Sequence, residues 1–368
     1  MTNATTQDTL NFAKKFSTYR DFYIKHNDLV FSKLGLGTFN KEPYKEENYV
    51  FHYIEGVKQA IRSGINVIDS ASNYRYGESE KEIGVAIKEL MDAKEIKREE
   101  LIICSKGGFI QLEFPFPANP YEWIETNIIE PKLATKDEIE LDQHCMSADY
   151  LEWSCKRSLK NLGVDSLDIY YLHNPEMQLS KLGKKEFYKQ IEKVFKRFEK
   201  LADDGLFKNY GVAVWNGFTI QNDELINLEE LVKIAIKVGG KEHRFKYVQV
   251  PFNMGKTDIY TQLSQSVANE SCTLLQAAHR LNIGVISSSS LLQMNLFKKS
   301  FKAESGVILD KSMTLENDIQ LALQFVRSTP GIITSLFASK VPVHVKQNVE
   351  ISKVPAVKRA SYDLLYRL

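Results

Sequence analysis

Short apolar, β-branched runs alternate along the chain with longer amphipathic stretches. Glycine, proline or asparagine bounds these runs, and their length and composition are typical of strands buried on both faces of a parallel sheet. The runs cover residues 34–38, 67–69, 101–105, 168–172, 210–214, 247–251, 284–288 and 334–338.

The stretches between these runs have the end signals of helices. They begin with acidic residues or stop before a glycine, which is ordinary helix punctuation. The predicted helices cover residues 78–90, 147–162, 184–203, 225–238 and 272–281. Eight strand–helix alternations predict an α/β protein with a (β/α)8 TIM barrel, in which active sites form at the C-terminal ends of the strands.

Four reactive side chains follow these runs in the order Asp69, Tyr74, Lys106 and His173. Taken singly, the charged ones have ordinary explanations as an acidic turn residue, a surface lysine and a hydrogen-bonded histidine. Three of the four stand at the end of a predicted strand, so they should meet at one rim of the barrel. Together the four side chains predict an acid–base site.

The chemistry of such a site follows from its residue types. A lysine ammonium beside a phenol favours the phenolate, so we expect the pKa of Tyr74 to fall from about 10 toward neutral pH. Asp69 would hold Lys106 charged and in place, and His173 would orient a carbonyl or share the proton. The set suits proton addition to a carbonyl oxygen while another group delivers hydride.

A longer sequence pattern surrounds the four side chains. Residues 64–71 have the sequence Gly-Ile-Asn-Val-Ile-Asp-Ser-Ala, and residues 77–80 have the sequence Gly-Glu-Ser-Glu. This pattern resembles the signature of the aldo-keto reductases, with Ser70 in place of the usual threonine and with Arg75 and Tyr76 inserted before Gly77. The resemblance covers about residues 30–353 and includes Ser105-Lys106, residues 171–176, residues 209–213 and Val248-Gln249.

The resemblance implies an oxidoreductase that binds NADP(H), with NAD(H) as a second candidate cofactor, and that interconverts a carbonyl compound or sugar with an alcohol. It makes Tyr74 the proton donor, Asp69 and Lys106 the residues that tune it, and His173 the residue that positions the carbonyl. Tyr76 is a second phenol nearby. The family places its tyrosine five residues after the aspartate, which selects Tyr74.

The resemblance also implies a set of cofactor contacts. Thr38 would turn onto the cofactor, and Gln249 matches the family's glutamine on the sixth strand. Lys340 would pair with the 2′-phosphate of NADP, and Asn348 would contact the adenine. His344 stands where the family often has arginine, which weakens the expected preference for NADP.

Two of the implied contacts depart from the family near the nicotinamide. Asn216 is the residue that would hold the carboxamide if the end of its strand is shifted. Ser288 stands where an aromatic ring normally stacks on the nicotinamide, and Trp215 is a candidate to supply that surface.

Two segments lie outside the predicted alternations. Residues 1–30 are rich in aromatic residues, and we expect them to pack across the bottom of the barrel. Residues 107–146 form a connection of about 40 residues with an aromatic half and an acidic half. Long connections of this kind are usually lids or binding loops. We expect a lid over the substrate pocket, with a packing or oligomer contact as the alternative.

Composition limits the remaining possibilities. The chain of 368 residues exceeds a bare barrel of about 250 residues only by enough for insertions, so we expect one domain over 1–368. The net charge of +1 does not indicate the basic surface that nucleic-acid binding needs. No apolar stretch approaches the length needed to span a membrane. Four cysteines without a paired pattern indicate reduced thiols in the cytoplasm, and the seven scattered histidines predict no metal site.

Two classes of function therefore remain. The first is an NADP(H)-dependent oxidoreductase acting on a small carbonyl or sugar substrate. The second is a regulatory or scaffold subunit that binds NADP(H) to sense redox state for a protein partner and has little turnover.

Overall fold

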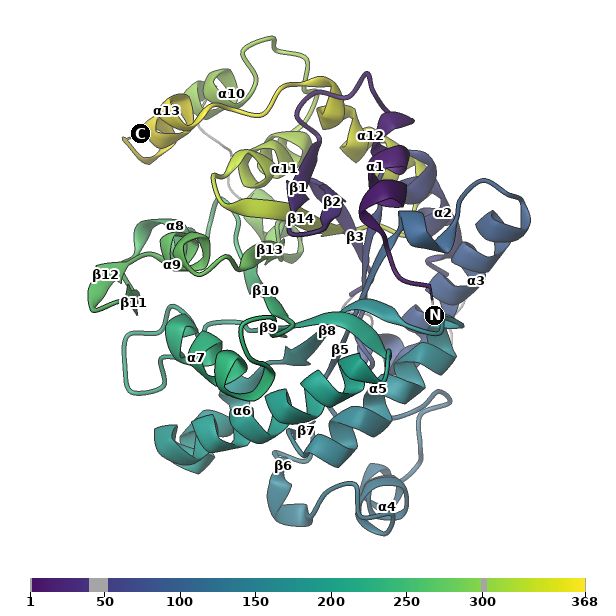
Figure 1. The fold of residues 1–368 in the computed structure, drawn as a ribbon. Helices are drawn as coiled ribbons and strands as arrows, with labels where there is room; N and C mark the ends of the chain where they lie inside the picture. The colour runs from purple at the N-terminus through teal and green to yellow at the C-terminus, as the bar shows by residue number, and fades with distance from the viewer. Residues whose placement is uncertain (1, 40–51, 299–302, 368) are drawn as a thin grey trace.

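The computed structural model describes residues 2–39, 52–298 and 303–367, and at its centre is a closed barrel of parallel strands (Figure 1). Each strand pairs with its neighbours in chain order, and the last pairs with the first. The barrel strands are β3 (Leu34–Gly37), β4 (Val67–Asp69), β5 (Ile102–Gly107), β8 (Leu167–His173), β9 (Phe207–Ala213), β10 (Phe245–Pro251), β13 (Gly284–Ser288) and β14 (Ile332–Ala338). The predicted (β/α)8 barrel is confirmed, and each predicted run forms one of its strands.

Helices surround the barrel and bury their apolar faces against it. They are α2 (Ile54–Arg62), α3 (Glu78–Asp92), α5 (Ala148–Leu162), α6 (Leu179–Asp203), α7 (Leu228–Gly239), α9 (Leu274–Arg280), α11 (Asp318–Ser328) and α12 (Pro342–Val349). The predicted helices form close to their expected bounds. Helix α6 begins earlier than predicted because a preceding turn joins it across Gly183, which has a non-helical φ of 68°.

The segment before β3 covers the end of the barrel at which the strands begin. It contains α1 (Thr6–Lys14) and a hairpin of β1 (Tyr23–His26) and β2 (Leu29–Ser32). Leu29 and Phe31 are fully buried in the cluster that fills the barrel interior. The Ala4 N–H donates to Asp168 Oδ1 at the start of β8, at 2.6 Å. This segment therefore closes the bottom of the barrel and leaves the opposite rim open.

The long connection after β5 is a separate small unit, which we call the insertion (residues 108–146). Gly107, placed in it by the sequence, is the last residue of β5. The insertion contains α4 (Pro120–Ile124), a π-helical turn (Glu125–Ile129) and a short hairpin of β6 (Ile139–Glu140) and β7 (His144–Cys145). Figure 1 shows α4 at the edge of the molecule, beyond α5. Its own apolar core comprises Ile110, Ile124, Ile128, Ala134, Cys145 and Tyr150 of α5.

The remaining elements lie in connections or near the end of the chain. They are α8 (Asp258–Thr261), β11 (Gln265–Val267), β12 (Glu270–Cys272), α10 (Ala303–Leu309) and α13 (Arg359–Tyr362), with short 3-10 turns between elements. Among the described residues, no helix has both the length and the apolar character needed to cross a bilayer.

Candidate active site

The C-terminal ends of β4, β5 and β8 bring three of the predicted side chains together at the barrel mouth, the rim where the barrel strands end. The strands are neighbours and parallel, so Asp69, Lys106 and His173 reach this rim together. Lys106 is fully buried, and its Nζ donates to Asp69 Oδ1 at 2.5 Å and to the Ser70 carbonyl at 2.7 Å. The barrel thus holds a lysine–aspartate ion pair away from water.

Tyr74 is the phenol beside this ion pair. It begins a 3-10 turn, and its ring centroid lies 4.9 Å from Lys106 Nζ and 6.1 Å from the His173 ring. The ring of Tyr76 instead lies 5.1 Å from Phe116 of the insertion. All four predicted catalytic side chains therefore meet at the mouth, whereas Tyr76 packs against Phe116.

The inserted pair Arg75-Tyr76 explains this division. Both residues have left-handed backbone conformations, with φ of 49° and 56°. The Arg75 side chain is buried, and its Nη1 donates to Glu82 Oε2 of α3 at 2.6 Å. The extra residues thus form a local excursion anchored on α3, which leaves Tyr74 at the mouth.

The electrostatics of the site differ from the expectation in one respect. Burial raises the pKa of Tyr74 above its usual value, and the Lys106 charge offsets only part of this effect, so the predicted fall toward neutral pH is wrong. Burial lowers the pKa of Lys106, but the Asp69 carboxylate and Tyr74 more than compensate, and the net shift is upward. The structure therefore pairs a protonated phenol with a charged lysine.

His173 is electrically neutral in this environment. Burial, the Lys106 charge and the neighbouring His144 together hold the pKa of His173 well below its usual range. Its Nδ1 atom is buried without a hydrogen-bond partner among the described residues. A neutral imidazole can donate one hydrogen bond to a carbonyl oxygen without carrying charge.

The residues expected to bind a cofactor fall into two groups. Gln249 and Thr38 join the catalytic cluster: Gln249 Nε2 donates to Asp69 Oδ2 at 2.8 Å, and Thr38 Oγ1 donates to the Asp69 carbonyl at 3.2 Å. Ser288 ends β13 at the same rim. Trp215 and Asn216 follow β9 and are exposed, with 44% of Trp215 accessible.

The second group lies after β14, where α12 begins. Helix α12 begins at Pro342, and no side chain caps its N-terminus. Lys340 lies two residues before the start of this helix, His344 is exposed in its first turn, and Asn348 is buried in its last turn. An uncapped helix N-terminus beside a lysine is suited to a phosphate group.

The insertion contributes side chains to the site that the sequence did not identify individually. The Phe109 ring lies 4.9 Å from the His173 ring and 5.4 Å from the His144 ring. His144 Nε2 donates to the His173 carbonyl at 2.7 Å. A Cβ atom on Gly108 would meet that carbonyl at 2.6 Å, so only glycine fits there. The aromatic content of the insertion indicated a role at the mouth, but nothing in the sequence marked His144.

Glu176 is a second residue that the sequence did not identify. It follows β8, and its Oε1 accepts the Trp215 N–H at 2.6 Å, whereas Oε2 is buried without a partner among the described residues. Burial raises the pKa of Glu176 to about 7. This carboxyl group therefore fixes the backbone beside Trp215 and titrates near neutral pH.

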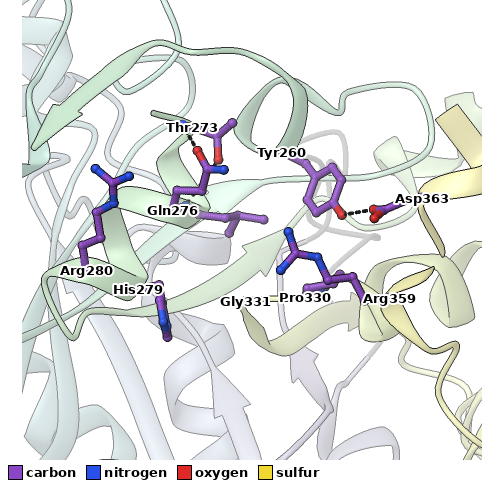
Figure 2. A pocket seen from close by; sticks show the side chains of 10 residues that line it. Tyr260, Thr273, Gln276, His279, Arg280, Pro330, Gly331, Arg359 and Asp363 are labelled. Carbon is purple, nitrogen blue, oxygen red and sulfur yellow. Dashed lines mark hydrogen bonds between the residues drawn. The ribbon is translucent and has the colours of Figure 1, made fainter. Parts of the chain in front are cut away.

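Two cavities lie away from the barrel mouth. One, of about 590 Å³, is lined by residues that include Tyr260 of α8, Gln276 of α9 and Arg359 of α13 (Figure 2). In it the Tyr260 hydroxyl donates to Asp363 Oδ1 at 2.5 Å. The other, of about 640 Å³, lies beside the insertion. None of the four clustered catalytic candidates lines either cavity.

Comparison with known proteins agrees with this geometry. The sequence model of the Aldo/keto reductase family matches residues 33–364, so the chain belongs to this family. It is 27% identical over 222 residues to aldose reductase B of Dictyostelium discoideum, covering 55% of this chain and 54% of the relative. It is also 27% identical over 218 residues to a putative voltage-gated potassium channel subunit beta of Schizosaccharomyces pombe, covering 58% and 50%. The chain thus spans about half the length of these curated relatives.

A solved structure shares the fold across nearly the whole chain. An aldo/keto reductase from Klebsiella pneumoniae, in complex with NADP and acetate, aligns with a TM-score of 0.59 at 17% identity and covers 92% of both chains. At this level of identity the likeness concerns the fold.

Proposed function

We propose that the protein is an NADP(H)-dependent oxidoreductase that interconverts an aldehyde, ketone or sugar carbonyl with an alcohol. One observation carries the proposal. A charged, fully buried Lys106 is paired with Asp69 and lies 4.9 Å from the Tyr74 ring centroid, and the ring of the neutral His173 lies 6.1 Å from that of Tyr74. This arrangement provides a proton donor and a hydrogen-bond donor for one carbonyl oxygen.

Each of the four side chains then has a distinct task. In reduction, Tyr74 gives its phenolic proton to the carbonyl oxygen, and the Lys106 charge stabilises the phenolate that remains. Asp69 keeps Lys106 charged and oriented. His173 donates a hydrogen bond to the same oxygen and fixes the direction of the carbonyl. In alcohol oxidation the phenolate takes the proton back.

The residues at the mouth fit a nicotinamide cofactor, which supplies or accepts the hydride when bound. Two buried polar atoms after β4, Ser72 Oγ and Asn73 Oδ1, lack hydrogen-bond partners among the described residues, as expected of groups that face a polar ligand. Gln249, Thr38 and Ser288 would lie along the nicotinamide half, with Asn216 and Trp215 at its edge.

The opposite half of the cofactor would lie at the start of α12. Lys340 would pair with the 2′-phosphate of NADP(H), and His344 and Asn348 would lie near the adenosine. The solved relative that contains NADP supports this cofactor for the present chain. Because position 344 holds histidine where the family often has arginine, use of NAD(H) as well is part of the proposal. The four free, buried cysteines support a reducing compartment, and we propose the cytoplasm.

A scaffold or redox-sensing subunit with little turnover is the alternative. The similarity to a putative potassium channel subunit beta favours it. Both functions use the same cofactor site, so binding of NADP(H) alone does not separate them.

Turnover separates the two functions. The oxidation of NADPH, and separately of NADH, is followed at 340 nm with a panel of aldehydes, ketones and sugars that includes nitrobenzaldehyde. We expect turnover with NADPH that obeys saturation kinetics for at least one carbonyl. Tight NADPH binding without turnover across the panel would favour the scaffold function. Absence of binding as well as turnover would contradict both.

A further inference from the structure

The cavity beside the insertion has no place in the proposed reaction. It measures about 640 Å³, which is within the usual size range of small-molecule sites. It lies among the first turn of α3, residues 153–161 of α5 and the stretch of the insertion that contains Glu113. Its lining comprises Lys81, Glu113, Phe114, Trp153, Lys156, Arg157, Lys160 and Asn161.

The charge of this lining is unusual for the chain. Four lining side chains are cationic and one is a carboxylate, although the whole chain has a net charge of only +1. Lys81 and Lys156 each pair with a glutamate of their own helix, at 2.7 and 2.6 Å. Such exposed pairs are weak and exchange readily with solvent. Lys160 forms no ion pair within the described part of the chain. The lining therefore carries an excess of positive charge.

Arg157 is held in place at the wall of the cavity. Its guanidinium lies 5.1 Å from the Trp153 ring and 5.7 Å from the Trp123 ring. Arg157 Nη1 donates to the Gln111 carbonyl at 3.0 Å, and Nη2 donates to the Glu113 carboxylate. The two rings and the Gln111 carbonyl fix the orientation of the Arg157 guanidinium. Little conformational entropy is therefore lost when the guanidinium binds another acceptor.

Glu113 is the removable partner of this arginine. It lies in an irregular stretch of the insertion, and 58% of its side chain is exposed. An exposed carboxylate that pairs with a fixed guanidinium occupies the position in which an anionic ligand would bind. A phosphate group has three acceptor oxygens and up to two negative charges. It can therefore pair with a guanidinium and two or three ammonium groups better than a single carboxylate can.

We propose that this cavity binds a small molecule that carries a phosphate group on an aromatic or apolar body. The phosphate replaces Glu113 at Arg157 Nη2 and contacts the ammonium groups of Lys156 and Lys160. The body lies against Phe114 and Trp153, which form the apolar part of the lining. The site is separate from the barrel mouth and from the helix proposed for the 2′-phosphate.

The test uses phenyl phosphate as the probe and titration calorimetry on the full chain. The titration is made with and without saturating NADP⁺, because phenyl phosphate could otherwise bind at the start of α12. We expect one site whose affinity does not change with NADP⁺ and falls as salt is added. The double variant Lys156→Glu/Lys160→Glu should weaken binding about tenfold or more, as expected for loss of charge-assisted contacts.

A matched control is available on α6. Lys196 is also an exposed helical lysine without an ion pair in the described residues, and Lys196→Glu should leave the affinity unchanged. Benzyl alcohol, which has the ring but no phosphate, should not bind. The proposal is overturned if NADP⁺ abolishes phenyl phosphate binding, if the double variant and Lys196→Glu bind it equally well, or if no binding is seen at millimolar concentrations. The readout is independent of turnover, so failure of the proposed reaction would not affect it.

Discussion

The strand ends at the barrel mouth and the insertion beside them contact the same histidine in different ways. The strand ends hold the Lys106–Asp69 ion pair in the barrel through buried hydrogen bonds. This pair acts on His173 through the Lys106 charge, and the Tyr74 ring lies 6.1 Å from the His173 ring. The insertion reaches His173 through the Phe109 ring and one hydrogen bond from His144. One region is rigid because of the barrel register, and the other has a small core of its own.

This difference separates two properties of the proposed enzyme. Residues on adjacent barrel strands cannot move independently, so they are suited to the proton chemistry, which tolerates little misplacement. A loop with its own core can change in sequence without disturbing the barrel, so it is suited to selecting among substrates. Substitutions at the strand ends should therefore change turnover most, and substitutions in the insertion should change substrate binding.

Tyr74→Phe should have the largest effect on turnover. The substitution keeps the ring over Lys106 and removes the proton, so kcat should fall about 10²- to 10⁴-fold while NADPH binding is nearly unchanged. The matched control is Tyr76→Phe, which should stay within a few-fold of the parent. If Tyr76→Phe were inactive and Tyr74→Phe active, the proton donor would be Tyr76.

Lys106→Met should reduce both stability and activity. It leaves the buried Asp69 carboxylate without its ion-pair partner, which costs about 3–5 kcal/mol of unfolding free energy in urea titrations. The double variant Lys106→Met/Asp69→Asn should recover much of that loss but not the activity. In either variant that folds, the pKa of Tyr74 should rise further, so reduction should be lost at a more alkaline pH than in the parent.

The opposite end of the barrel offers a control for this experiment. Arg98 Nη2 lies 2.9 Å from Asp168 Oδ2 in a second buried ion pair, at the end where the strands begin. Arg98→Met should cost a similar 3–5 kcal/mol of stability, while the folded fraction keeps its kcat and pH profile. A loss of kcat at constant folded fraction would show that the two ends of the barrel are coupled.

Phe109→Ala should affect substrate binding more than the chemical step. Removal of a ring that contacts His173 should raise KM for aromatic carbonyls about 10- to 100-fold, the value of about 1–3 kcal/mol of apolar contact, with kcat within a few-fold. Phe116→Ala, which removes a more exposed ring that contacts Tyr76, should change KM less. A large fall in kcat with constant KM would place Phe109 in the chemistry instead.

Lys340→Ala should weaken NADPH binding by about 1–3 kcal/mol, because a charge-assisted contact to the 2′-phosphate is lost. NADH binding should be little changed, which fluorescence titration of both cofactors can measure. Lys346→Ala, in the last turn of the same helix, is the control. Equal losses for NADPH and NADH would indicate a structural role for Lys340.

Glu176→Gln should have the smallest effect on turnover, and its effect is visible in how stability depends on pH. The folded pKa of about 7 lies above the value of about 4.3 in an unfolded chain, so the folded state binds the extra proton between these pH values. This contribution is complete below about pH 4.3 and is lost as pH rises through 7. The parent should therefore lose on the order of 3–4 kcal/mol relative to Glu176→Gln across this range, because each pKa unit corresponds to about 1.4 kcal/mol. Parallel stability curves for the two proteins would contradict the assignment.

The strand ends could be predicted because their signal is local. Each barrel strand is a short apolar run, and parallel pairing alone determines that Asp69, Lys106 and His173 share a rim. The pKa of Tyr74 could not be predicted in direction, because the outcome depends on how much burial opposes the Lys106 charge. The spacing from Asp69 selected Tyr74 over Tyr76, but the contact of Tyr76 with Phe116 depends on the left-handed backbone of the inserted pair, which the sequence does not show.

The insertion was predictable only as a feature near the mouth. Its length and its aromatic residues indicated a role there, but the contact between His144 and His173 depends on the path of a 39-residue segment with its own core. Glu176 is similar, because its raised pKa comes from burial against the Trp215 backbone and not from a neighbouring charge that the sequence would show.

The hydrogen bond from Ala4 to Asp168 has a consequence for how the chain is made. Its two partners are 164 residues apart. During vectorial synthesis, the first helix and hairpin leave the ribosome long before β8 exists, so their docking surface is missing while much of the chain is translated. Contacts of such long range form slowly, because a large loop must close first. The face of that hairpin with Leu29 and Phe31, which is buried in the folded protein, therefore stays exposed until the later barrel strands have been made.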